Sequence, residues 1–300
     1  MAISRAQLVK ELEPGLNALF GLEYRQYANE AAEIFDTESS DRAFEEEVML
    51  SGFANASVKP EGQGVQFDDA QETFTARYTN ETIALAFAIT EEAIEDNLYD
   101  RLASRYTKAL ARSMANTKQV KAAAVLNNGF NANFAGGDGV ALFATDHPTI
   151  AGTFSNELAV ASDLNETSLE QALIDIAAMT DERGLKIASR GMKLISPSAL
   201  QFTADRLMKS EGRTGTADND INAVRNMGMI PEGYTVNHFL TSNKKWFIKT
   251  DVPNGLKHFV RSPIKTSMEG DFDTGNVRYK ARERYVFGFS DPRGIFGSDI

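Results

Sequence analysis

The sequence has no cysteine and only three histidines, namely His147, His238 and His258. Without cysteine, the chain makes no disulfide and no thiolate metal site, and it uses no cysteine nucleophile. The spacing of the three histidines matches no zinc-binding pattern. No apolar run approaches the roughly 18 residues that a membrane-spanning helix needs. The sequence therefore predicts neither a metal centre nor a membrane anchor.

Motifs for nucleotides and calcium are also lacking. The glycines at 136–139 follow a predicted helix rather than a strand, and no P-loop lysine accompanies them. The acidic clusters at 218–220 and 271–273 do not continue into an EF-hand loop. We therefore expect no cofactor and no bound metal.

One acid–base pair is present in the sequence, Asp146 followed by His147. A soluble hydrolase that uses these two residues is the alternative function that the sequence leaves open. No G-x-S-x-G elbow or comparable nucleophile signature accompanies them. A histidine in a polar loop is the interpretation that we favour for His147.

Acidic and basic residues are unevenly distributed along the chain, whose formal net charge is −11. Residues 1–100 contain 21 acidic and 6 basic residues, whereas residues 101–300 contain 21 acidic and 25 basic residues. Because the first part is acidic and the remainder mildly basic, one copy can lie with its first part on the remainder of another. A solvated acidic surface that keeps the protein in solution is the alternative.

Four basic residues occupy every second position near the C-terminus, at Arg278, Lys280, Arg282 and Arg284. We call them the cationic stripe. Their period is typical of a β-strand, which places the cations on one face and the mostly aromatic intervening side chains on the other. Such a pattern also occurs on surfaces that bind single-stranded nucleic acid. A sequence pI of about 4.9 argues against a dedicated nucleic-acid binder and favours a stripe that contacts carboxylates.

Residues 1–50 are acid-rich and weakly patterned. A short helix through Leu8, Leu12 and Leu16 fits the apolar spacing, but Pro14 is expected to interrupt it. We expect this segment to act as an arm that contacts another surface.

Residues 56–89 predict a long β-hairpin with its turn at 68–71, where the sequence reads DDAQ. Phe74 and Tyr78 lie on one face of its second half, but the large side chains move to odd positions after 80–82. This change of parity indicates a bulge or twist. Because a lone two-stranded ribbon is only marginally stable in water, the outer half is expected to lie on another surface.

A long helix is expected from Thr90 to Asn127, with acidic residues in its first turns. At ~1.5 Å per residue it spans roughly 57 Å, enough to cross a whole subunit. A second unit follows, with a capping box at Thr167, a buried strand at 192–198 and an amphipathic helix at 198–210. Helices and strands are mixed without a βαβ rhythm, which predicts an α+β fold.

Several stretches of the sequence resemble the major capsid proteins of tailed phages, which have the Hong Kong 97-type fold. The resemblance is carried by LFATDHP (142–148), TDERGLKI (180–187), KLISPSALQFTADRLM (193–208) and YKARERYVFGFSDPRGIFG (279–297). SRAQLVKELEPGLNALFGLEY and DRAFEEEVMLSGF, near the N-terminus, are similar to the starts of such proteins. The likeness covers essentially the whole chain and is greatest to the Mu-like major head subunits.

The resemblance implies four parts. They are an N-terminal arm (1–50), an extended loop with a β-hairpin (51–89), a peripheral domain with a spine helix (90–150 and 265–300) and an axial domain (151–264). It implies that many copies self-assemble into hexamers and pentamers of an icosahedral bacteriophage head that encloses double-stranded DNA. The chain is then a structural protein of the virion, assembled in the host cytoplasm, and not an enzyme.

In this family the arm and extended loop reach over neighbouring subunits, so both are expected to contact other copies. The residues expected at inter-subunit contacts are Lys59, Phe74, Tyr78, Glu45, Glu46, Glu47 and the four cations of the stripe. DNA is expected to make only non-specific contacts with the shell.

Two departures from the family pattern carry further expectations. Capsid-like sequence starts within a few residues of Met1, so we expect a separate scaffolding protein, alongside a portal, as the assembly partner. Some relatives crosslink a lysine of the extended loop to an asparagine on a neighbour. Lys59 is the only lysine between residues 11 and 107, and no crosslinking motif surrounds it. We therefore expect no crosslink.

Overall fold

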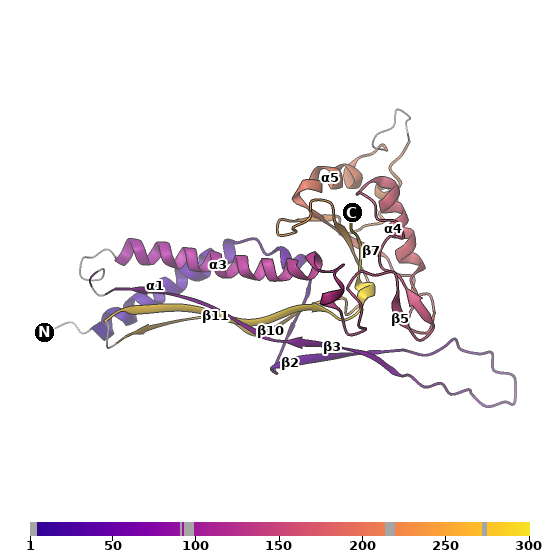
Figure 1. Cartoon of the computed structure of the whole chain (residues 1–300), viewed down its shortest axis with the longest axis horizontal. Helices are drawn as coiled ribbons and strands as arrows, with labels where there is room; N and C mark the ends of the chain where they lie inside the picture. Colours follow the sequence, from indigo (N-terminus) through magenta and orange to yellow (C-terminus); the bar gives the residue numbers. More distant parts are fainter. Residues whose placement is uncertain (1–4, 91, 93–98, 214–219, 272–274) are drawn as a thin grey trace.

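The protein is elongated, with a second body at one end of a long bar and a thin ribbon that projects below that body (Figure 1). The computed structural model describes residues 5–90, 92, 99–213, 220–271 and 275–300. Helices α1 and α3 run along the long strands, whereas α4, α5 and β7 belong to the second body. The mixture of helices and strands confirms the predicted α+β class.

The bar is built on a four-stranded sheet in the order β1-β10-β11-β4. Its centre is the antiparallel pair of β10 (Leu256–Gly270) and β11 (Val277–Phe289). Strand β4 (Glu81–Ile89) pairs antiparallel with β11, and β1 (Asp36–Ser39) pairs parallel with β10. Side chains alternate across this sheet, so one face is available for helices and the other faces away from them.

Helix α3 (Tyr99–Asn127) covers the inner face of the sheet. Its Leu110, Ala111 and Met114 are buried in the same cluster as Tyr279 and Ala281 of β11. The helix ends at the residue that the Asn127-Asn128-Gly129 sequence predicts. The acidic first turn expected from Thr90, with Glu91, Glu95 and Asp96, lies outside the described residues.

Helix α1 (Arg5–Gln26) packs beside α3 and corrects one prediction. Pro14 lies inside this helix and does not interrupt it. A proline removes one backbone hydrogen bond, but Leu16 and Phe20 bury their side chains against α3 and β11 just after it. Tertiary packing therefore outweighs the local penalty.

The second body holds a four-stranded sheet in the order β12-β9-β7-β8. Its core is apolar and includes the buried Leu194, Trp246, Ile248 and Phe296. Its elements are α4 (Glu166–Ala178), β7 (Gly191–Pro197), α5 (Gln201–Lys209), β8 (Tyr234–Asn237), β9 (Trp246–Thr250) and β12 (Ile295–Ser298). The buried strand and the amphipathic helix predicted at 192–210 are confirmed.

The N-cap of α4 differs from the prediction. Asn165 accepts a hydrogen bond from the Ser168 N–H (2.9 Å), and the Asn165 N–H donates to the Ser168 hydroxyl (3.0 Å). The capping box therefore begins two residues before Thr167. The asparagine side chain is an equally good N-cap, which the serine/threonine pattern overlooks.

Two elements cross the domain boundaries that the family resemblance implies. Strand β10 continues from 256 through 270, past the expected boundary at 264/265. Strand β12, from the expected peripheral segment, pairs with β9 in the sheet of the second body.

The predicted hairpin at 56–89 has a different partner. Strand β3 (Glu72–Thr79) pairs antiparallel with β2 (Phe44–Leu50), which lies in the expected arm. Residues 51–71 form the extended loop between them. The predicted change of parity is confirmed: β3 belongs to the ribbon, whereas β4, which starts at Glu81, belongs to the long sheet.

Short elements connect these parts. They are the 3-10 turns η1 (Glu30–Glu33), η2 (Ala132–Phe134), η3 (Ser198–Leu200) and η4 (Pro292–Gly294), the strands β5 (His147–Thr149) and β6 (Gly152–Phe154), and helix α6 (Ala223–Asn226). In the part of the chain that the structure describes, no helix has the length and apolar character of a membrane span.

His258 of β10 is buried where β1 joins the sheet. Its Nδ1 lies 3.1 Å from the Thr37 hydroxyl, and its ring stacks on Phe287 with centroids 4.2 Å apart. Burial, helped by the positive charge of Lys118, lowers the pKa of His258 from 6.5 to about 3. The folded protein therefore keeps this imidazole neutral at pH values where the unfolded chain protonates it.

This difference predicts a loss of stability in acid. The stability is complete above pH 6.5 and falls as the pH drops toward 3, by up to ~1.4 kcal/mol per pH unit. Between pH 6.5 and pH 5, the free energy of unfolding should fall further in the unchanged protein than in His258→Gln, by up to about 2 kcal/mol. Urea unfolding at the two pH values measures this difference. Equal losses in both proteins would show that His258 does not titrate on unfolding.

Candidate assembly surfaces

The cationic stripe lies on the uncovered face of the long sheet. Arg278, Lys280 and Arg282 are exposed and Arg284 is half-buried, whereas the intervening Tyr279, Ala281, Glu283 and Tyr285 are buried. The predicted alternation is therefore confirmed. The buried side chains face α1 and α3, and the cations alternate with them along the strand and lie on the opposite face.

On strand β4, the side chains beside the stripe are small. Ala84, Ala86 and Ala88 of β4 lie opposite the cations in the antiparallel register, so they share the outer face. On the other side, Lys265 of β10 lies opposite Arg282 and adds another positive charge. We call Lys265, the stripe and the three alanines the cationic face. Its described ion pair is that of Arg278 with Asp271.

Below the stripe, the inner face carries a buried acid. Glu283 lies 3.3 Å from the Tyr24 hydroxyl, which donates to it, and 3.8 Å from the Lys118 ammonium. Burial raises the pKa of Glu283, and the positive charge of Lys118 opposes that shift. This contact joins α1 and α3 to β11 and helps to hold the sheet with its cationic face outward.

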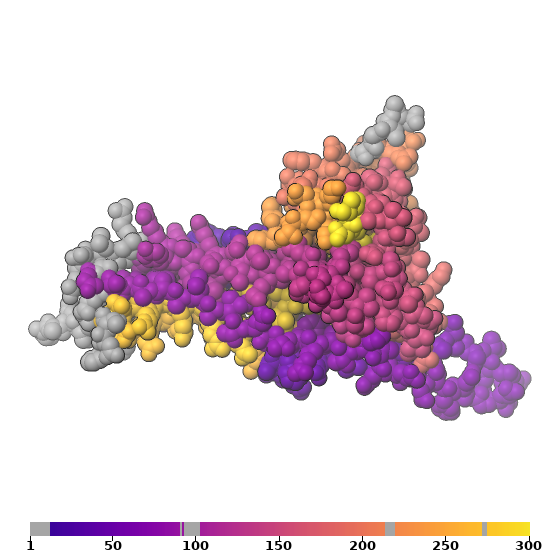
Figure 2. Space-filling model, in the orientation of Figure 1, coloured from indigo at the N-terminus to yellow at the C-terminus, as the bar shows by residue number. Residues whose placement is uncertain are grey.

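The extended loop, residues 51–71, carries apolar side chains in water. Val58 is 93% exposed and Phe67 is 94% exposed, and Phe53 and Val65 are exposed as well. Figure 2 shows the loop extending beyond the rest of the molecule. An apolar set of this kind on a projecting segment is typical of a surface that contacts another molecule.

Hydrogen bonds join the two ends of the extended loop. The Ser51 N–H donates to the Gln71 carbonyl (2.8 Å), and the Gln71 N–H donates to the Ser51 hydroxyl (2.9 Å). Further out, the Ala54 N–H donates to Asp68 (2.7 Å). These bonds make the loop a narrow two-limbed projection rather than an open excursion.

Several residues expected at inter-subunit contacts have partners within the chain. Glu45 accepts hydrogen bonds from Ser40 and from the backbone at 41–42, and Glu47 contacts Lys257 (3.3 Å) and Ser290. Tyr78 is buried against Phe259. Lys59 is exposed and Phe74 is half-buried, whereas Glu46 is exposed but lies 3.8 Å from the Arg77 guanidinium.

The acidic first part of the chain also pairs with the chain's own basic remainder. The pairs are Glu23–Arg112, Glu30–His238, Glu33–Lys193, Asp36–Lys249, Glu38–Lys257, Glu47–Lys257, Asp68–Arg183 and Glu81–Lys121 among the described residues. The charge complementarity that the sequence assigns to two copies is thus used in part within one subunit. Fewer acidic side chains are left for a neighbour than the sequence suggests.

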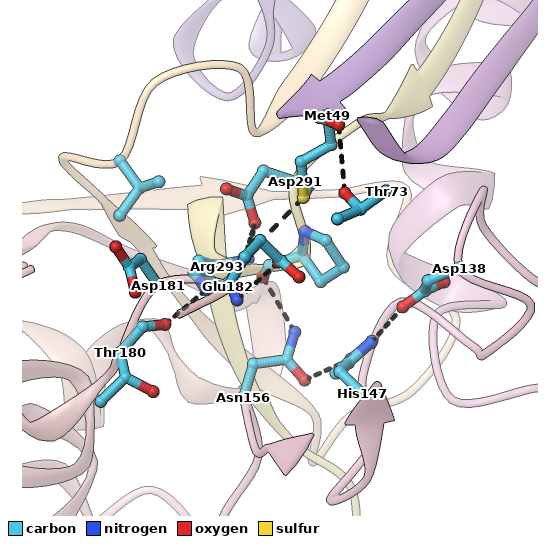
Figure 3. Close-up of polar contacts among 12 residues, drawn as sticks. Met49, Thr73, Asp138, His147, Asn156, Thr180, Asp181, Glu182, Asp291 and Arg293 are labelled. Atoms are coloured by element: carbon cyan, nitrogen blue, oxygen red, sulfur yellow. Dashed lines mark hydrogen bonds and ion pairs between the residues drawn. The ribbon is translucent and has the colours of Figure 1, made fainter. Parts of the chain in front are cut away.

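The ribbon joins the body at a buried polar network around Arg293 (Figure 3). The Arg293 guanidinium lies 2.8 Å from Glu182 and 3.3 Å from Asp291, and it donates to the Thr180 carbonyl (2.7 Å). It also stacks over the Phe154 ring at 4.0 Å. Burial raises the pKa of Asp291 against the opposing charge of Arg293. Loss of one partner from such a pair leaves an uncompensated buried charge, which costs about 3–5 kcal/mol.

His147 belongs to the same region and is completely buried. Its Nδ1 lies 2.6 Å from Asp138, and its Nε2 lies 3.1 Å from the Asn156 Oδ1. That amide is oriented by its Nδ2, which donates to the Leu142 carbonyl (2.7 Å) among others. Both ring nitrogens are thus engaged by partners within the protein, and neither is open to a substrate.

The histidines therefore differ from the sequence interpretation. His147 lies in β5 rather than in a polar loop, its partner is Asp138, and Asp146 is exposed. Its burial denies a substrate access and argues against the hydrolase alternative. His258 is packed within the long sheet, whereas the side chain of His238 is 63% exposed and contacts Glu30. Across the described ranges, no group of three or more histidine, aspartate or glutamate side chains is placed to hold a metal ion.

The glycine-rich segment at 129–139 has a structural task. A Cβ at Gly137 would lie 2.7 Å from the Thr75 carbonyl oxygen and 2.9 Å from the Ala76 nitrogen, both in the backbone of β3. Only glycine allows this close approach. The segment therefore contacts the ribbon of β2 and β3 directly and positions it against the rest of the subunit.

Comparison with known proteins places this geometry in a family. The sequence profile described as "Phage capsid protein" matches residues 72–297.

The chain belongs to this phage capsid protein family.

Solved structures agree on the fold. The procapsid protein of bacteriophage JBD30 is 18% identical, with a TM-score of 0.53 over 99% of this chain and 76% of that one. The virus-like particle protein from Pyrococcus furiosus is 10% identical, with a TM-score of 0.52 over 95% and 98%. A phage-related protein from Bordetella bronchiseptica is 12% identical, with a TM-score of 0.52 over 93% and 95%. A comparison with curated protein sequences gives no match.

These findings make the chain a capsid shell protein with the α+β fold of the Hong Kong 97 type, as the sequence resemblance predicts. It is a structural protein of a bacteriophage head. The cationic face and the extended loop are accordingly surfaces of a capsid subunit.

The contact at Gly137 gives a testable consequence for this capsid protein. Gly137→Ala should lower the free energy of unfolding by about 1–3 kcal/mol, because the new methyl group forces the ribbon backbone away. Gly64→Ala is the matched control, since a Cβ there meets no atom within 4 Å. Denaturant unfolding of both variants measures the effect. A Gly137→Ala protein as stable as the control would contradict the close contact.

Proposed function

We propose that many copies of this capsid protein assemble into hexamers and pentamers of an icosahedral shell that encloses double-stranded DNA. The observation that supports this most strongly is that one subunit carries two different surfaces that it leaves exposed, the extended loop and the cationic face. The extended loop exposes Val58 and Phe67, and the long sheet leaves its cationic face open. Two different surfaces of this kind suit a head-to-tail contact, which closes into rings.

The two surfaces contribute differently to such a contact. Complete burial of a valine or phenylalanine side chain stabilises by about 1.5–3 kcal/mol. An exposed ion pair contributes at most ~1 kcal/mol. The apolar side chains of the loop therefore supply most of the free energy of association, and the cations select the register and exclude wrong partners.

The residues that we propose at the contact between copies are those whose side chains are exposed or half-buried in the subunit, including Glu46 and Arg278, which also pair with Arg77 and Asp271. They are Lys59, Glu46 and Phe74 on the loop and ribbon, and Arg278, Lys280, Arg282 and Arg284 on the cationic face. Glu45, Glu47 and Tyr78 contribute indirectly, because their contacts within the chain hold the ribbon in place.

The parts of the subunit have distinct proposed places in the shell. Residues 1–50 are the arm, 51–89 include the extended loop, and 90–150 with 265–300 form the peripheral domain around α3. Residues 151–264 form the axial domain, around which the capsomers close. The second body, with its own sheet and apolar core, supports this assignment because it stands apart from the bar in Figure 1.

The partners that we propose are other copies of the chain, a separate scaffolding protein, a portal and packaged DNA. The net charge of −11 suits a DNA container, because a wall that bound phosphates tightly would hinder packing and ejection. Assembly takes place in the host cytoplasm, and the product is the virion. Among capsid proteins, we propose the Mu-like head subunits as the nearest relatives.

Charge reversal on the cationic face tests this function. Lys280→Glu with Arg282→Glu should lower the yield of closed particles at least tenfold, a loss of about 1.4 kcal/mol or more in assembly free energy. The subunit should remain folded, since both side chains are exposed. Negative-stain electron microscopy and sedimentation measure the yield.

Arg190→Glu with Lys244→Glu is the control, because it makes the same charge change at exposed positions of the second body. Equal particle yields from the Lys280→Glu, Arg282→Glu variant and the unchanged protein would contradict the proposed contact. An unchanged protein that forms neither hexamers, pentamers nor closed particles, even with its scaffolding protein, would contradict the shell itself.

A further inference from the structure

The turn at 180–186 connects the second body to the extended loop. We propose that this turn sets the direction in which the loop leaves the subunit, and that Arg183 is the positioning residue. The inference rests on the proposed assembly function, because the direction matters only if the loop must land on another copy.

The turn is internally rigid. One Asp181 carboxylate oxygen accepts hydrogen bonds from the Arg183 N–H (2.9 Å) and from the Leu185 N–H (2.8 Å). The Asp181 N–H donates to the Leu185 carbonyl (2.8 Å), and Gly184 adopts a φ of +80°, which glycine tolerates without strain. Thr180 and Lys186 close the turn as a β-bridge. Side chains that leave this turn therefore start from a fixed frame.

Two consecutive side chains leave the turn in different directions. Glu182 is buried and pairs with Arg293 at 2.8 Å, which anchors the turn to the network at the root of the ribbon. Arg183 instead reaches the extended loop, where its guanidinium donates to the Asp69 carbonyl (2.6 Å) and lies 4.0 Å from the Asp68 carboxylate. The turn thus connects a fixed point in the body to a point on the projecting loop.

Arg183 contacts the loop where its two limbs are joined. Asp68 accepts the Ala54 N–H from the opposite limb. This hydrogen bond, followed by the Arg183 charge, keeps the pKa of Asp68 below its usual value, so the carboxylate stays ionised near neutral pH. Arg183 therefore contacts one limb directly and is connected to the other through Asp68.

The contact matters because the other anchors of this projection act on the ribbon and not on the loop. Gly137 and Phe259 hold strand β3, whereas Arg183 contacts residues 68–69, beyond the paired strands. A loop that is already aligned loses less conformational entropy when it meets another copy. The ion pair that holds it is partly exposed and hence weak enough to adjust during assembly.

A distance measurement tests the proposal directly, and the cysteine-free chain makes it simple. Gln63→Cys on the loop and Asn243→Cys on the second body, both exposed, accept spin labels in the dissociated subunit. We expect a narrow distance distribution in the parent protein and about a twofold broader one with Arg183→Ala. Arg206→Ala, an exposed arginine of α5, is the control and should leave the distribution unchanged.

Additional variants keep every outcome informative. Arg183→Lys keeps the charge but not the fork of donors, and we expect an intermediate width. If Arg183→Ala does not fold, Arg183→Gln, which is nearly as long but neutral, takes its place. The same width with and without the arginine, or equal broadening by Arg206→Ala, would overturn the proposal.

Particle assembly separates this inference from the proposed function. Arg183→Ala should lower the yield of closed particles severalfold while its thermal midpoint stays near that of the parent. A parent protein that forms no particles would contradict the assembly function, yet the distance distributions would still decide the role of Arg183. Particles of normal yield and shape from Arg183→Ala would show that the loop needs no such guide.

Discussion

The antiparallel pairing of β10 with β11 is the interaction on which the rest of the structure depends. Its register places Tyr279 and Ala281 under α3 and the cationic stripe on the opposite face. A slip of one residue would exchange the two faces and bury several cations, at a cost of several kcal/mol each. The register that buries the core therefore also exposes the cations of the outer face to water or to another molecule. In a capsid subunit, the same strands thus provide both the stability of the monomer and a surface for assembly.

Features that depend on local periodicity could be predicted from the sequence. The alternation at 278–285 and the apolar rows of α3 each repeat within a few residues, so no distant contact is needed to recognise them. The change of parity near residue 80 was visible for the same reason. The cationic face was thus predicted in its placement, although the alanines of β4 that leave it open became clear only from the strand register.

Features that depend on distant contacts could not be predicted. Strand β3 pairs with 44–50 rather than with the adjacent 56–67, and the only local signal against the adjacent pairing is the set Pro60, Gly62 and Gly64, which weakens a strand there. The pair of Glu182 with Arg293 joins two turns that are far apart in sequence. His147 takes Asp138 rather than the adjacent Asp146 for the same reason. The acidic character of residues 1–100 follows from the sequence, but the sequence does not show that several of these acidic side chains pair within the chain.

The central claim is that the extended loop is complete only when it lies on another copy. Hydrogen–deuterium exchange of residues 51–71, compared between dissociated subunits and closed particles, tests it most directly. The account predicts rapid exchange in the subunits and protection in the particles, around the side chains of Val58 and Phe67 that are exposed in the single chain. Equally rapid exchange of this loop in closed particles would contradict the claim.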